Sequence, residues 1–296
     1  MSHEHNHDHT FTSLNRAFVI GITANLLFVA AEFAAGLYTR SMGLLSDAGH
    51  NLSDVAGLIL AMLAFRLARV HSNRRYTYGY RKSTVLVSLF NAVILLVAAG
   101  IIIAESIDKF LRPQPLHGGA IAAVAGVGVM VNAFTAWLFM KDRERDLNIK
   151  GACLHMAADA LVSAGVVVSG LAIVYTGRYF IDPLIGLVVA LVIVYSTWSL
   201  LRDSIRLSLD GIPRNIDRDA VEALIRTVEG VEDIHHLHIW ALSTTETALT
   251  AHVVLPDTSR MAAVKSRIKS LLHAHAVSHV TLEFETGETD CPDNCI

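Results

Sequence analysis

Six long apolar stretches constrain this chain of 296 residues more than any other feature. They cover residues 16–37, 44–67, 84–107, 118–140, 152–175 and 181–201. A helix needs about 20 apolar residues to cross a bilayer, and it satisfies its own backbone hydrogen bonds there. We therefore expect residues 16–202 to form a membrane domain of six transmembrane helices.

Basic residues are concentrated in alternate loops between these stretches. The loops after the second and fourth stretches are rich in arginine and lysine. These residues are Arg66, Arg69, Arg74, Arg75, Arg81, Lys82, Lys141, Arg143, Arg145 and Lys150. Because basic loops stay in the cytoplasm, the pattern places both termini there. The compact loops favour the inner (cell) membrane of a bacterium.

Residues 203–296 have the pattern of a small soluble domain. Helical periodicity at 218–229 and 260–275 alternates with strand patterns at 231–242, 248–255 and 278–284. This αββαβ order predicts a ferredoxin- or metallochaperone-like α+β fold, with metal-binding and dimerisation roles. Residues 1–15 are expected to form a His-rich cytosolic tail. The net charge of −3 excludes general attraction to nucleic acid.

Two matched pairs of ionisable residues lie inside the apolar stretches. His50 and Asp54 form a His-x-x-x-Asp set in the second stretch, and His155 and Asp159 form another in the fifth. A spacing of four places both side chains on one helical face. Two such helices side by side would present four nitrogen and oxygen donors to one point, which suits zinc. An ionisable residue costs about 2.5–3.5 kcal/mol at the centre of a membrane helix, so we expect a functional role.

An alternative is that these groups only hydrogen-bond one another between helices. The matching of the two sets favours the metal site over this alternative. Asp47 lies on the same face as His50 and is either an acceptor that orients it or a proton site. Cys153 is turned about 200° from His155 on an ideal helix, so we expect it to be a packing residue.

Four motifs, spread over nearly the whole chain, resemble the cation diffusion facilitator family, specifically its zinc-transporting branch. The motifs are SDAGH at 46–50, RYTYGYR at 75–81, KGA at 150–152 and HIWAL at 238–242. The first continues to Asp54, and the third continues to His155 and Asp159. The resemblance implies that His50, Asp54, His155 and Asp159 are the transport ligands. It also implies a homodimer and proton-coupled export of zinc from the cytoplasm by alternating access.

The termini carry further candidate ligands. The resemblance places a cytosolic metal site at His235 and His252 on adjacent strands and Glu285 after the third strand. It adds Cys291 and Cys295, although their C-x3-C spacing departs from the C-x2-C of some members. The N-terminal His3, His5, His7 and His9 either capture metal or form a weakly chelating tail.

The leading interpretation is a secondary active transporter, a zinc/proton antiporter, rather than an enzyme. Zinc is then the transported substrate and a ligand of the cytosolic domain, and the partners are zinc ions, protons and the lipid bilayer. One alternative is a membrane-bound zinc sensor with a structural intramembrane site. Another is a transporter whose main substrate is cadmium, cobalt or nickel. A membrane metalloprotease is disfavoured because the chain has no His-Glu-x-x-His set.

Overall fold

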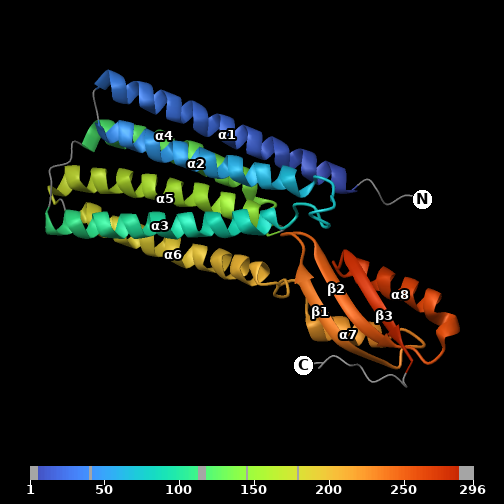
Figure 1. Ribbon diagram of the computed structural model, residues 1–296. Coiled ribbons are helices and arrows are strands. Elements are labelled where there is room, and N and C mark those ends of the chain that lie inside the picture. Colours follow the sequence, from blue (N-terminus) through green and yellow to red (C-terminus); the bar gives the residue numbers. More distant parts are fainter. Residues whose placement is uncertain (1–5, 40–41, 113–117, 145, 179, 287–296) are drawn as a thin grey trace.

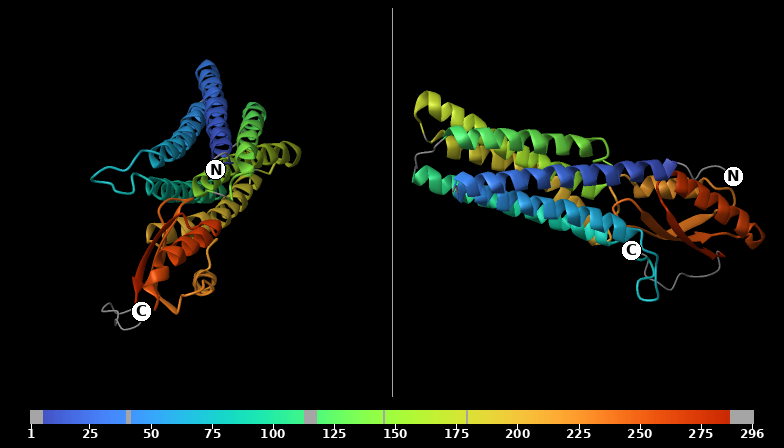
Figure 2. Two further views of the ribbon diagram at one scale, coloured as in Figure 1. Left: turned by 90° about the vertical axis from the view of Figure 1, so that its right-hand side faces the viewer. Right: turned by 90° about the horizontal axis from the view of Figure 1, so that it is seen from above.

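The computed structural model describes residues 6–39, 42–112, 118–144, 146–178 and 180–286. Six long helices form an elongated bundle, and a smaller α/β part is attached at one end (Figure 1). The N-terminal end of the first helix lies at that same end of the bundle (Figure 2).

The six helices contain all six apolar stretches. They are α1 (Asn6–Thr39), α2 (Met42–Ala68), α3 (Ser83–Leu111), α4 (Gly118–Met140), α5 (Leu147–Thr176) and α6 (Ile181–Ser208). Among the described residues, three segments are long and apolar enough to cross a membrane: Arg16–Ala34, Ser83–Leu111 and Pro183–Ser208. Helix α1 begins at Asn6, so it extends into the region expected to be a separate tail.

Helix pairs α1/α2, α3/α6 and α4/α5 make the closest contacts in the bundle. Near the α/β part, one apolar cluster joins α1, α2, α4 and α5. Its centre is Phe18 of α1, whose ring lies 4.9 Å from Phe139 and 5.7 Å from Phe65. Cys153 belongs to this cluster and is 4% exposed, which agrees with the expected packing role.

The α/β part has the predicted order of helices and strands. It consists of α7 (Arg218–Arg226), β1 (Asp233–Ala241), β2 (Thr247–Val254), the 3-10 turn η1 (Thr258–Arg260), α8 (Met261–Ala274) and β3 (His279–Glu285). The strand order is β1-β2-β3, with β1 antiparallel and β3 parallel to β2. Apolar side chains of α7 and α8 pack with those of the sheet in one core. The other sheet face is free to carry polar residues.

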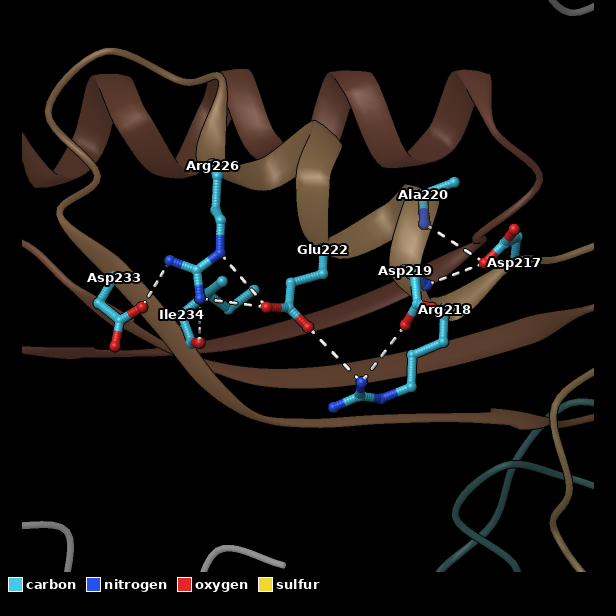
Figure 3. A network of polar contacts seen from close by, with 8 residues as sticks. All are labelled: Asp217, Arg218, Asp219, Ala220, Glu222, Arg226, Asp233 and Ile234. Atoms are coloured by element: carbon cyan, nitrogen blue, oxygen red, sulfur yellow. Dashed lines mark hydrogen bonds and ion pairs between the residues drawn. The ribbon is translucent and has the colours of Figure 1, made fainter.

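Polar contacts fix α7 at the edge of this core (Figure 3). The Asp217 side chain caps the helix by accepting from the backbone N–H groups of Asp219 and Ala220. Arg226 then joins the helix to β1, because its guanidinium lies 2.6 Å from Asp233 and also donates to Glu222. The hydrogen bond from Arg226 lowers the pKa of Asp233 below its usual value.

The tip of the β1–β2 hairpin, residues 243–246, docks on the membrane bundle. The Thr244 backbone N–H donates to Thr84 Oγ1 over 3.1 Å, and the Thr244 hydroxyl donates to Asp146. Arg81 pairs with Glu246. Lys82 donates to Asp210 over 2.6 Å and to the backbone oxygen atoms of Leu207 and Ala241. The two parts are therefore joined by side chains as well as by the connector after α6.

Candidate metal sites

The fifth-helix pair lies inside the bundle. His155 Nε2 and Asp159 Oδ2 are 3.7 Å apart, and the two side chains are 14% and 13% exposed. Met156, between them, is fully buried. The one-turn spacing of the two donors therefore brings them together on α5, as the sequence pattern predicts.

The second-helix pair lies on a stripe of α2 that faces the bundle interior further along the helix. Positions 50 and 54 share this stripe with Leu58 and Ala61, which are buried in the cluster that includes α5. The side chains of Asp47, His50 and Asp54 lie outside the described residues. Their backbone positions are on α2, which contacts α5 directly.

The depths of the two pairs match. Asp54 is 14 residues from Ala68, the end of α2 next to the α/β part. Asp159 is 12 residues from Leu147, the corresponding end of α5. At about 1.5 Å per residue, the two aspartate positions lie about 21 Å and about 18 Å from their helix ends. Two neighbouring helices thus carry their aspartates at similar levels.

A buried carboxylate on α1 holds the residue that follows His50. Glu32 is 2% exposed and Asn51 is 9% exposed. Asn51 Nδ2 donates to Glu32 Oε2 over 2.8 Å. The sequence marks Glu32 as a costly charge in an apolar stretch, but it does not show its partner, because the contact joins two different helices.

A second donor cluster lies on the open face of the sheet. One ligand atom each from His235, His252 and Glu285 lie within 4.8 Å of one another. Glu285 stands between the two imidazoles: its Oε1 is 2.6 Å from His252 Nδ1 and its Oε2 is 3.1 Å from His235 Nε2. Among the described residues, this is the only such group of three or more His, Cys, Asp or Glu side chains.

Strand register brings these three residues together. His235 of β1 is directly opposite His252 of β2, and Glu285 ends β3, where it is next to Val254. The backbone oxygen of Glu285 also accepts from Leu255 N–H over 2.8 Å, which fixes the end of the strand.

The donor set fits a divalent cation. Within the described part of the chain, His235 Nε2 is buried and has no hydrogen-bond partner. A buried ring nitrogen is costly to leave unmatched, and a cation would match it. Two imidazoles and one carboxylate are ligands that zinc accepts in proteins. These three residues would hold the ion and leave a fourth position open.

The other candidate ligands lie outside the description. His3, His5, Cys291 and Cys295 fall outside the described residues, and so do the side chains of His7 and His9, although their backbone is part of α1. Their roles stay predictions.

Two protein-family profiles match the chain. The profile of the cation efflux transmembrane domain matches residues 18–207. The profile of the cation efflux protein cytoplasmic domain matches residues 213–286. Together they cover the helical bundle and the α/β part.

Several bacterial proteins are similar to the chain over nearly its whole length. A cadmium, cobalt and zinc/H(+)-K(+) antiporter of Bacillus subtilis is 33% identical, over 100% of this chain and 95% of the relative. The zinc transporter ZitB of Escherichia coli is 32% identical, over 98% and 95%. The metal cation efflux system protein CzcD of Cupriavidus metallidurans is 32% identical, over 98% and 92%.

Proposed function

The chain belongs to the cation efflux family, also called the cation diffusion facilitators, and we propose that it exports zinc from the cytoplasm in exchange for protons. His50, Asp54, His155 and Asp159 bind the transported ion. The observation that carries the proposal is the pair of His155 and Asp159 inside the bundle, with α2 carrying the matching pair at a similar depth.

Proton coupling follows from the chemistry of the ligands. Imidazole titrates near neutral pH, and it binds metal only when it is deprotonated. Zinc arriving from the cytoplasm displaces protons from the site, and protons arriving from the opposite side displace zinc. Competition of this kind exchanges the two ions without a chemical fuel.

The remaining features of the proposal concern topology and assembly. All six helices cross the bacterial inner membrane, with both termini in the cytoplasm. The basic loops support this orientation, and so does the position of the start of α1 at the same end of the bundle as the α/β part (Figure 1). The α/β part pairs two chains into a homodimer and binds zinc at His235, His252 and Glu285.

Zinc flux under an imposed pH gradient tests the transport proposal. Purified protein is placed in liposomes with an acidic interior, and zinc entry is followed with a fluorescent zinc indicator. We expect accumulation that a protonophore abolishes. Asp159→Asn should reduce the flux to background, because the substitution removes a charged ligand. Glu105→Gln is the matched control, since it neutralises an exposed carboxylate of α3 and should transport normally.

Two results would contradict the proposal. Zinc flux that does not depend on the pH gradient would rule out proton exchange. Bound zinc without any flux in the unaltered protein would favour the sensor instead. The name of the Bacillus subtilis relative makes cadmium and cobalt the ions to compare with zinc in the same liposomes.

A further inference from the structure

Strand β1 contains an irregularity at the cytosolic donor cluster. His235 pairs with His252, but the next pair is His238 with Thr250. Two residues of β1, His236 and Leu237, therefore lie opposite the single residue Ala251. This two-against-one arrangement is a β-bulge.

The bulge forces a histidine into a rare backbone conformation. His236 has φ 53°, in the left-handed region. This region is unfavourable for a residue with a side chain, and non-glycine residues found there are concentrated at functional sites. The strain needs a compensating contact or a functional reason.

The bulge places two consecutive histidines on the open face of the sheet. Ile234 and Leu237 are both buried in the core, with exposed fractions of 3% and 7%. A regular strand would leave one outward residue between two inward ones, whereas here His235 and His236 both lie between them. The imidazole of His236 then stacks on that of His252, with ring centroids 4.8 Å apart and an interplanar angle of 27°.

The His252 ring is thereby held on three sides. Its Nδ1 lies 2.6 Å from Glu285 Oε1, and its Nε2 lies 3.6 Å from Glu283 Oε2. His236 covers a face of the ring. A ligand whose other ring nitrogen meets a carboxylate is oriented for metal binding, and the stack adds control of the ring plane.

We propose that His236 is a positioning residue that holds the His252 ring in the plane required for cation binding, which rests on the proposed cytosolic zinc site. His236 does not itself bind the ion: the described donor atoms that lie within 4.8 Å of one another come from His235, His252 and Glu285. The bulge is the structural means that brings the His236 ring to the ligand.

Cobalt binding to the full-length protein tests this role. The transport site is first silenced by Asp54→Asn and Asp159→Asn, so that the cytosolic site alone is titrated. Cobalt is followed by its visible absorption spectrum, and zinc affinity is measured by displacement of the cobalt. In this background, His236→Gly keeps a backbone that adopts positive φ easily but lacks the ring. His236→Phe keeps a stacking ring without a metal-binding nitrogen.

We expect His236→Gly to weaken zinc binding by about tenfold, the lower end of the effect of residues that orient ligands, and to change the cobalt spectrum. His236→Phe should restore most of the affinity. Ala276→Gly is the matched control, because Ala276 also has positive φ, at 65°, and belongs to the same part of the molecule. It should change neither the affinity nor the spectrum.

Three outcomes separate the inference from the proposed site. Unchanged affinity and spectrum in His236→Gly would overturn the inference. Loss of binding in His236→Phe equal to that in His236→Gly would also overturn it, because the nitrogen and not the stack would then matter. His252→Ala that still binds one cobalt ion would instead refute the cytosolic site itself. Thermal unfolding of each variant confirms that the domain is folded.

Discussion

Single buried polar residues shape the membrane bundle where a polar group has one partner on another helix. The Glu32–Asn51 bond is the clearest case, since both residues are buried and Asn51 directly follows His50. The bond joins α1 to the turn of α2 that carries the first His-x-x-x-Asp set. It therefore restrains the rotation of α2 at the proposed transport site.

Replacing Asn51 with leucine should destabilise the protein by about 1–3 kcal/mol, because the buried Glu32 carboxylate loses a donor. The measurement is thermal unfolding in detergent. Glu32→Gln is the control, since its amide oxygen still accepts from Asn51 and stability should change less. Equal stability of Asn51→Leu and the unaltered protein would show that the bond contributes nothing.

Close packing at the scale of elements depends on small residues where two helices meet. Helices α3 and α6 are in contact over much of their lengths. At Gly186 of α6, an added Cβ would lie 2.4 Å from Ser106 Oγ, but 3.6 Å from Ser106 Cβ. The hydroxyl, and not the backbone of α3, is therefore what an alanine would meet.

Gly186→Ala should cost about 1–3 kcal/mol, as overpacking does in a well-packed interior. The double variant Gly186→Ala/Ser106→Ala should recover most of the loss, because the remaining carbon atoms would be in ordinary contact. Thermal unfolding of the single and double variants measures both effects. A double variant as unstable as the single one would show that the clash lies elsewhere.

The whole molecule depends on the joint between the bundle and the α/β part. Asp146 lies at this joint: it is buried, accepts from the Thr244 hydroxyl and caps the start of α5 through the backbone N–H groups of Asn148 and Ile149. A cavity of about 380 Å³ beside it is lined by residues of both parts. Because α5 also carries His155 and Asp159, the joint connects the cytosolic sheet to the proposed transport helix.

Asp146 should make the stability of the joint depend on pH. Burial raises the pKa of its carboxyl above the ordinary value of 3.8. The folded protein therefore holds this proton more tightly than the unfolded chain does. The resulting stabilisation is fully present below pH 3.8 and is lost as the pH rises through the folded-state pKa.

Asp146→Asn keeps an oxygen that accepts the capping hydrogen bonds but does not ionise. The melting temperature of the variant, relative to that of the unaltered protein, should therefore increase as the pH rises from acid to neutral. A constant difference across this range would contradict the assignment of the effect to Asp146.

The extent to which the sequence predicts the molecule differs between helices and sites. Apolar stretches place all six long helices, and periodicity gives the order of α7, β1, β2, α8 and β3. Both features are local, since each depends on residues close together in the chain. The start of α1 at Asn6 was missed because the polar residues 6–15 carry no apolar signal.

The metal-binding chemistry follows the same division. The sequence by itself determined which residues can bind a cation, because one-turn spacing fixes His155 beside Asp159 whatever surrounds them. Only the tertiary structure decided that Asn51 meets Glu32, that Thr244 meets Asp146 and that His236 stacks on His252. These contacts join segments far apart in the chain, and they depend on helix packing, strand register and one bulge, which no local pattern specifies.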